Sequence, residues 1–398
     1  MLFSELKVID AASFLAGPCA ATLLSDYGAD VIKIEPPGGD RHRSIAAGHP
    51  SEHSWQLTDR NRRGLCLDIA QPEGREVLLD LLRTADVFVV NFSAAQMAKF
   101  DLEWETLKAV NPKLIYAEIS AYGLKGADAE KRAFDLTGFF ARTGILDWMH
   151  DKDEAPVIAP GGVGDHATAM TLFAGILMAL YKRDRTGEGS MVTTSLSATG
   201  TWANGLALQA VIAGVDDAAR RDREGWSNPL QNIYTTGDGR HMFIAVQNIR
   251  RDWPKLVEVL ERPEWLEDEN MQPVKPLFRN RFQAKQRIAE AAADLTAEEL
   301  GRRLELSGIV HGLVKKNAEV LEDPQLIENG VIIPFDSGLP DADRTLAPPI
   351  NITGETLRKP SRAPKIGEHT DEVLREHGFD EDTISRLVEA GVVRRAEA

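Results

Sequence analysis

LKVIDAASFLAGPCAATLLSDYGADVIKIE, residues 6–35, joins two short β-branched runs through one helical pattern. LKVID and DVIKIE have the composition of buried strands, and CAATLLSDYGA lies between them. A strand, a helix and a second strand at this spacing form a parallel βαβ unit. The sequence therefore predicts an α/β fold with a parallel sheet.

The same alternation continues to about residue 125. LCLD, VFVVNF and LIYAEIS predict further strands, and PEGREVLLDLLRTA predicts a helix. Pro72 stands at the start of that helix, where its missing N–H costs nothing, and Val77, Leu78, Leu81 and Leu82 follow at helical spacing.

The middle of the chain is strongly apolar. ATAMTLFAGILMALYKR, within 166–183, is apolar on nearly every side, which predicts a helix buried in a domain or an interface. MVTTSLSATGTWANGLALQAVI, residues 191–212, predicts a strand leading into another buried helix. The longest apolar runs fall short of roughly 18 residues, which favours core helices over membrane spans.

Charge, Gly and Pro then concentrate, and we expect residues 211–229 to be a linker. The Gly-Asp-Gly of YTTGDGRHMFIAVQ predicts a β-hairpin. Helical patterns complete a small α+β domain at 230–325, and the tail at 330–398 ends in two more helices. The expected helices are 253–261, 281–293, 296–306, 370–377 and 381–390.

Composition excludes several function classes. The chain has 398 residues, 43% of them hydrophobic, which favours two domains. A net charge of −15 and a pI of about 5.2 disfavour nucleic acid and anionic membranes as partners. Cys19 and Cys66 do not have the spacing of a disulfide framework or a zinc site, and the N-terminal segment does not have the pattern of a signal peptide. We therefore expect a cytoplasmic protein.

Asp165, in GGVGDHATA, is the strongest candidate for chemistry. Three glycines allow a sharp turn and leave room for a ligand, and the carboxylate would stand at the start of the apolar helix. The alternative is an N-cap role, in which Asp165 only accepts backbone N–H groups. Asp135, in KRAFDLTGFF, has the same alternative of a capping or solvated role.

Other candidates are weaker. Cys19 follows Gly17-Pro18 at an expected helix N-terminus, but no partner base lies nearby in the sequence. His49 and His53 have i,i+4 spacing without a third ligand, so no metal is expected. Neither a dinucleotide fingerprint nor a P-loop occurs. Scattered cations predict a solvated face, with a recessed phosphate site as the alternative: Arg62, Arg63, Lys99, Lys131 and Arg132.

Four separated segments resemble, in the same order, the family III CoA-transferases, the CaiB/BaiF group that includes carnitine and formyl-CoA transferases. They are LAGPCAATLLSDYGADVIKIEPPGGD, NRRGLCLDIAQPEGREVLLDLLRTADVFVVNF, GGVGDHATA and INITGETLRKPSRAPKIGEHTDEVLREHGF. The resemblance implies a large Rossmann-like domain built from 1–210 and 330–398, a small central domain, and an interlocked homodimer. It also implies that the apolar helices near 170–180 and 202–212 contribute to the dimer interface as well as to the core.

The resemblance assigns the chemistry to Asp165, in the family's G-D-x-x-T turn, here Gly164 to Thr168. It implies acyl-CoA and a carboxylic acid as substrates. By position, the CoA contacts would be Leu15, Ala16, Leu67, Ala70, Asn91, Phe92, Ser93, Lys99, Arg132, Phe134 and Asp135, several of them through backbone.

Departures from the pattern bear on the substrate. Leu15 and Pro36 replace the Gln and Arg of oxalate-using relatives, and no run of glycines follows residue 225. Oxalate and formyl-CoA are therefore disfavoured. NPLQNIYTTGDGRHMFIAVQN is more similar to relatives acting on larger hydroxy, aryl or branched acids.

The expected mechanism is attack of the Asp165 carboxylate on an acyl thioester, giving a mixed anhydride and then an aspartyl-CoA thioester. The glycine-rich turn would supply N–H donors to the oxyanion. Two alternatives remain. An α-methylacyl-CoA racemase would need a His where this chain has Phe134. A non-catalytic acyl-CoA-binding protein would not need Asp165.

Overall fold

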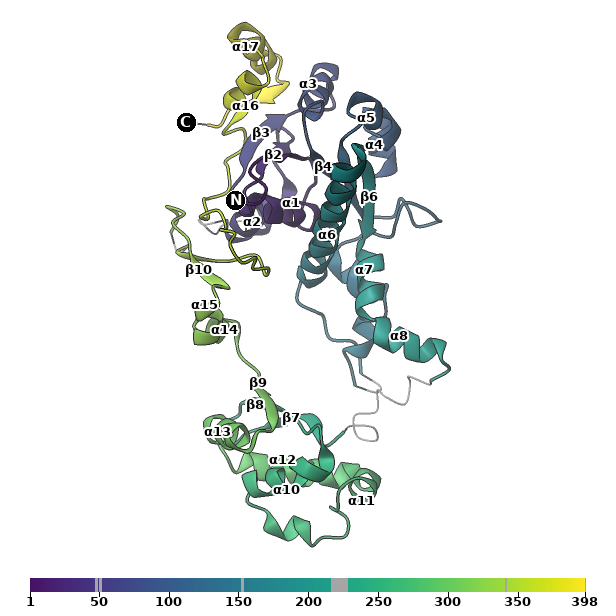
Figure 1. Ribbon diagram of the computed structural model, residues 1–398, viewed down its shortest axis with the longest axis vertical. Coiled ribbons are helices and arrows are strands. Elements are labelled where there is room, and N and C mark those ends of the chain that lie inside the picture. The colour runs from purple at the N-terminus through teal and green to yellow at the C-terminus, as the bar shows by residue number, and fades with distance from the viewer. Residues whose placement is uncertain (47–48, 50–51, 152–153, 216–227, 341, 398) are drawn as a thin grey trace. The chain divides into compact units, whose positions relative to one another are not determined.

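The computed structural model describes residues 1–398 except 47–48, 50–51, 152–153, 216–227, 341 and 398. Its main feature is a seven-stranded sheet with the order β12-β3-β2-β1-β4-β5-β6 (Figure 1). All neighbours pair in parallel except β12 with β3. The predicted α/β fold with a large parallel sheet is confirmed. The strands are β1 (Lys7–Asp10), β2 (Asp30–Glu35), β3 (Arg63–Leu67), β4 (Val87–Val90), β5 (Ile115–Ser120), β6 (Ser190–Ser195) and β12 (Val393–Arg394).

Helices cover both faces of this sheet because successive strand residues point to opposite sides. Val8 packs with α1 (Ala16–Asp26) and α6 (Val163–Thr186) on one face. Ile9, the next residue, packs on the other face, which five helices cover. These are α3 (Pro72–Leu82), α4 (Ala94–Phe100), α5 (Trp104–Val110), α16 (Thr370–Glu376) and α17 (Glu381–Glu389).

The strand order reverses between β1 and β4. From β1 the chain proceeds outward to β2 and β3, and it then returns to β4 on the other side. In open α/β sheets, ligands bind at the carboxyl ends of the strands at such a point. Here two hydrogen bonds join the loop after β1 to the loop after β4. Asn91 Oδ1 accepts from Ser13 N at 2.9 Å, and Asn91 Nδ2 donates to Ser13 O at 2.8 Å.

The chain divides into two compact units. The larger unit contains 1–147, 158–205 and 324–398, so both chain ends contribute to it. The smaller unit contains 148–157 and 206–323. Most of the expected linker, 211–229, lies outside the described residues. The larger unit also contains α2 (His53–Asp59), α15 (Pro324–Glu328) and the antiparallel pair β10 (Ile332–Pro334) and β11 (Arg344–Leu346).

The smaller unit contains an antiparallel sheet with the order β7-β8-β9. β7 (Gln231–Thr235) and β8 (His241–Ala245) form the predicted hairpin, which is confirmed, and β9 (Val310–Leu313) pairs with β8. Helices contribute a separate core around Trp253 and Leu300. The helices of this unit are α8 (Gly205–Ile212), α10 (Ile249–Val259), α11 (Lys275–Arg279), α12 (Arg281–Ala293), α13 (Ala297–Ser307) and α14 (Asn317–Leu321).

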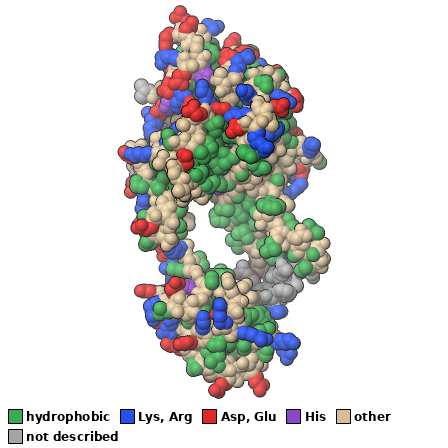
Figure 2. Space-filling view, in the orientation of Figure 1, with side chains coloured by type: hydrophobic (Ala, Val, Ile, Leu, Met, Phe, Trp, Pro, Cys, Tyr) green, Lys and Arg blue, Asp and Glu red, His purple; other side chains and the backbone are tan. Residues whose placement is uncertain are grey.

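The apolar middle helices differ from the expectation of burial. α6 has 24 residues, and by length and hydropathy alone it could span a membrane, yet it packs on α1, β5 and β6. Met178 and Tyr181 of α6 and Trp202 of α7 (Leu196–Ala203) are exposed, and Figure 2 shows hydrophobic side chains gathered over these helices. α8 has no buried residue, so the prediction of a second buried helix is wrong for the single chain. The sequence shows that a helix is apolar, but it does not show which part of the protein or of a partner buries its side chains.

Candidate functional site

A buried ion cluster positions the loop after β1. Lys33 Nζ lies 3.2 Å from Asp40 Oδ2 and 3.6 Å from Asp10 Oδ2, and it also donates to Ala12 O. Arg62 Nη1 contacts Asp10 Oδ2 at 2.5 Å and Asp59 Oδ1 at 2.8 Å. All of these side chains are buried. The expectation that Arg62 lies on a solvated face is therefore wrong, because buried carboxylates pair with its guanidinium.

Asp165 lies in the first turn of α6 rather than at its N-cap. The N-cap residue is Gly162, in the left-handed conformation with φ +88°, and the helix begins at Val163. Asp165 is half-buried, and within the described part of the chain its carboxylate has no hydrogen bond or ion pair. The alternative in which Asp165 caps the helix is therefore contradicted.

Asp135 has the capping role instead. Its Oδ2 accepts from Gly162 N at 2.6 Å, across a sequence separation of 27 residues. Asp135 is buried and immediately precedes a π-helical turn, Leu136–Ala141. Both roles considered for Asp135 are therefore corrected: its side chain is buried rather than solvated, and it makes no hydrogen bond to the turn that it precedes but accepts from the backbone at the start of α6.

Burial raises the pKa of both carboxyl groups, and the charge of Asp135 also acts on Asp165. Burial and, to a smaller extent, the charge of Asp135 raise the pKa of Asp165 to about 7. Burial also raises the pKa of Asp135, while the N–H groups of Gly162, Gly164 and Asp165 act in the opposite direction. Only the Gly162 bond has full hydrogen-bond geometry, and Asp135 Oδ1 meets no such donor. A carboxyl group that titrates near neutrality beside a second carboxylate is typical of catalytic sites.

Gly164 allows this close packing. A Cβ at this position would lie 2.2 Å from Asp135 Oδ1 and 2.3 Å from Phe139 Cγ. Gly162 lies on the opposite side of the turn, where a Cβ would be 4.0 Å from Leu15 Cδ1. The β1–α1 loop and the start of α6 are therefore neighbours at the carboxyl edge of the sheet.

The structure brings several of the expected CoA-contact positions to this edge. Leu15 reaches Gly162, and Ala16 begins α1. Asn91 is joined to the β1 loop, and Ser93 caps α4 by accepting from Gln96 N at 3.2 Å. Phe92, which follows Asn91, packs against Phe100 at a ring distance of 6.1 Å.

The remaining positions are more dispersed. Leu67 is fully buried in the core, so only its backbone could meet a ligand. Ala70 is exposed after β3, which is separated from β1 by β2. Lys99 and Arg132 are exposed, and Lys99 Nζ lies 5.3 Å above the Phe100 ring. Phe134 is also exposed but is not dispersed, because its ring pairs with that of Phe14 in the loop after β1.

The structure gives no support to the weaker candidates. Cys19 is buried and its pKa is raised, chiefly by desolvation, so the thiolate is disfavoured. The rings of His49 and His53 lie 5.3 Å apart. Across the residues that the structure describes, no group of three His, Cys, Asp or Glu side chains could hold a metal ion.

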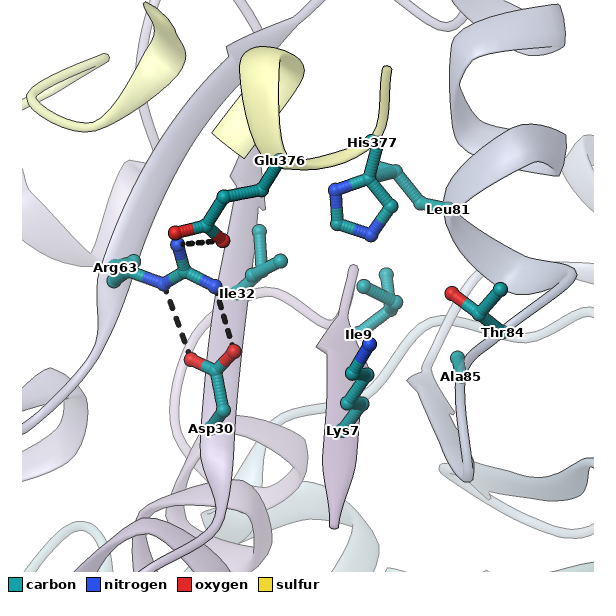
Figure 3. Close-up of a pocket in the computed structure, with 10 residues that line it drawn as sticks. All are labelled: Lys7, Ile9, Asp30, Ile32, Arg63, Leu81, Thr84, Ala85, Glu376 and His377. Atoms are coloured by element: carbon teal, nitrogen blue, oxygen red, sulfur yellow. Dashed lines mark hydrogen bonds and ion pairs between the residues drawn. The ribbon is translucent and has the colours of Figure 1, made fainter. Parts of the chain in front are cut away.

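A cavity of about 50 Å³ lies at the amino ends of the strands (Figure 3). There Arg63 joins Asp30, at 2.6 Å, to Glu376 of α16, also at 2.6 Å. This network links α16 to the sheet. Asp165 does not line the cavity, which is at the edge opposite to the carboxyl-end loops.

Sequence reasoning missed Phe14 and the pairing partners Lys33 and Asp59. Phe14 has φ +64°, a conformation rare for a bulky residue, and no sequence signal marks it. Lys33 and Asp59 appear as single charges in otherwise ordinary segments. An isolated Lys within the apolar strand DVIKIE was the one signal of a buried pair.

Comparisons with known proteins agree over the full length. The model of "CoA-transferase family III" matches residues 3–370. The (R)-2-hydroxy-4-methylpentanoate CoA-transferase of Clostridioides difficile is 31% identical, covering 99% of this chain and 100% of the relative. The succinyl-CoA:mesaconate CoA-transferase of Haloarcula hispanica is 33% identical, with 95% and 97% covered. A crystal structure of a CaiB/BaiF family protein from Brucella suis has a TM-score of 0.83 at 28% identity, with 94% and 98% covered.

Proposed function

This chain belongs to CoA-transferase family III and is a CoA-transferase, and from that premise we propose that Asp165 carries CoA as a covalent thioester. The proposal rests on the observation that, within the described residues, one of two neighbouring carboxylates is hydrogen-bonded and the other is not. Asp135 accepts the helix N–H group, which leaves the Asp165 carboxylate without a partner in the described structure. An unpartnered, half-buried carboxylate is available as a nucleophile.

The reaction consists of two exchanges that mirror each other. An Asp165 oxygen attacks the acyl carbon of the donor thioester, the C–S bond breaks, and CoA leaves as a thiolate. The thiolate then attacks the aspartyl carbonyl of the mixed anhydride, which releases the donor acid and leaves an aspartyl-CoA thioester. An acceptor carboxylate repeats both steps in reverse, so that its acyl group leaves on CoA and Asp165 is restored.

The environment of Asp165 supports this chemistry. A pKa of about 7 leaves a substantial carboxylate fraction at neutral pH, and it makes that carboxylate more basic than a solvated one. Desolvation also protects an anhydride from water. Asp135 already occupies the Gly162 N–H group, so the proposed oxyanion donors are other N–H groups of the turn and of the first turn of α6.

The relatives differ in substrate, so the donor and acceptor are proposed only as an acyl-CoA and a small carboxylic acid. A homodimer is supported by apolar helices that the single chain leaves uncovered. Trp202 of α7 is 87% exposed, and Leu206 of α8 is 90% exposed. Such side chains are commonly buried in obligate interfaces.

Trapping with hydroxylamine tests the covalent step. After an acyl-CoA is added, hydroxylamine should convert the aspartyl thioester into a hydroxamate at Asp165, which peptide mass spectrometry detects. Asp165→Ala should lose CoA exchange while its CoA affinity stays within about tenfold of wild type. Asp184→Ala is the matched control, since Asp184 is a carboxylate near the other end of α6.

The outcomes also separate the alternatives. A non-catalytic acyl-CoA-binding protein would yield no hydroxamate in any variant. A racemase would exchange the α-proton without labelling, and it would need a second base that Phe134 cannot supply. Full exchange activity in Asp165→Ala would refute the proposal.

A further inference from the structure

Phe14 is held in an unfavourable backbone conformation in the loop between β1 and α1, next to Leu15, which lies near the turn that precedes Asp165. Its φ of +64° lies in the left-handed region, which bulky residues rarely occupy. Such conformations cost free energy and persist only where the surrounding structure imposes them. Strained backbone conformations concentrate at binding and catalytic sites.

Three side chains from different segments impose it. The successive N–H groups of residues 12, 13 and 14 donate to Asp10 Oδ1 at 2.9 Å, Asn91 Oδ1 at 2.9 Å and Asp40 Oδ1 at 3.3 Å. Asp40 is in turn paired with Lys33. The buried ion cluster therefore holds the loop as a rigid support for the Phe14 side chain.

The support directs Phe14 toward a second aromatic ring. The rings of Phe14 and Phe134 have centroids 5.4 Å apart at an interplanar angle of 75°, an edge-to-face pair. Phe134 is 65% exposed, an unusual amount for phenylalanine.

Both rings belong to segments that contact the turn before Asp165. Phe134 immediately precedes Asp135, which binds Gly162 N. Phe14 immediately precedes Leu15, which reaches the other side of Gly162. The aromatic pair is therefore attached on both sides to the turn that presents the reactive carboxylate.

We propose that the Phe14–Phe134 pair is the wall that receives the acyl group, and that it selects aryl or bulky branched acyl chains. This inference rests on the proposed covalent function of Asp165. An exposed ring with one edge-to-face partner still offers a face to an apolar substituent.

Self-exchange tests the selectivity without requiring knowledge of the natural partner acid. The enzyme is given phenylacetyl-CoA with isotopically labelled phenylacetate, or acetyl-CoA with labelled acetate, and label entering the thioester is followed by mass spectrometry. We expect the wild type to prefer phenylacetyl over acetyl exchange in kcat/KM. The ratio should fall by about tenfold or more in Phe134→Ala, as for the loss of a large apolar contact.

Phe14→Gly is the second variant. It removes the ring, and glycine adopts a φ of +64° without steric cost, so the loop is relaxed rather than strained. The ratio should fall as it does in Phe134→Ala. Phe282→Ala, at an exposed phenylalanine of α12, is the matched control and should keep the wild-type ratio.

Each outcome is decisive. If the ratio is unchanged in both variants, or if the wild type exchanges acetyl but not phenylacetyl groups, the aromatic wall is refuted while CoA transfer stands. If the wild type exchanges neither acyl group and forms no hydroxamate, the proposed function fails and the inference fails with it.

Discussion

Replacing Gly164 with alanine tests the packing on which the site depends. The new Cβ would lie 2.2 Å from Asp135 Oδ1, 2.3 Å from Phe139 Cγ and 2.6 Å from Phe139 Cβ. Ordinary contacts between such atoms are about 3.5–4.0 Å. Phe139 is buried and the clash involves the base of its ring, so either the capping carboxylate or the start of α6 must move by about 1 Å.

The substitution changes the free energy of unfolding in two opposite ways, through helix propensity and through overpacking. Alanine in place of glycine in a helix gains about 0.5–1 kcal/mol. Overpacking a filled site costs about 1–3 kcal/mol, so the net expectation is a loss of stability of roughly 1–2 kcal/mol. A displacement of about 1 Å at a catalytic group costs about 100-fold in rate.

Two measurements check this: CoA exchange by mass spectrometry gives kcat, and urea unfolding gives the free energy of unfolding. Gly161→Ala is the control, because a Cβ there meets nothing within 4 Å. We expect it to retain kcat within about threefold, since no atom must shift. A Gly164→Ala enzyme with wild-type kcat and stability would show that Asp165 does not depend on this packing.

Two further predictions concern charge. The carboxylate of Asp165 is the attacking form and its pKa is raised to about 7, so kcat/KM should fall as pH decreases below about 7. Asp135→Asn keeps a hydrogen-bond acceptor for Gly162 N but removes the negative charge, so the pKa of Asp165 and the pH at which kcat/KM falls should both decrease. If the fall in kcat/KM moves to higher pH or does not move, the charge of Asp135 does not raise the pKa of Asp165. Lys33→Met leaves the buried Asp40 without its ion-pair partner, while Asp10 and Asp59 keep Arg62, and it should cost about 3–5 kcal/mol in urea unfolding. Lys125→Met, at an exposed lysine, should leave the unfolding midpoint unchanged, and equal midpoints for both variants would mean that the buried cluster contributes nothing to stability.

Local patterns were sufficient for the elements of secondary structure. The runs LKVID and DVIKIE became β1 and β2, and the Gly-Asp-Gly turn became the β7–β8 hairpin. These predictions succeed because strand alternation, helical spacing and turn chemistry depend on residues within a few positions of one another. The motif around Asp165 made it the candidate nucleophile, which stays a prediction, and the alternative of an N-cap role for it was wrong.

Contacts between distant segments decided the rest. Which of two aspartates caps α6 depends on a bond between Asp135 and Gly162, 27 residues apart. Arg62 looked like a surface cation until the fold placed it beside Asp10 and Asp59. The strained conformation of Phe14 results from partners at three separate positions. The sequence by itself therefore determined the α/β class and the candidate reactive side chain, whereas only the tertiary structure assigned partners to each charge, because pairing depends on proximity in space rather than on spacing along the chain.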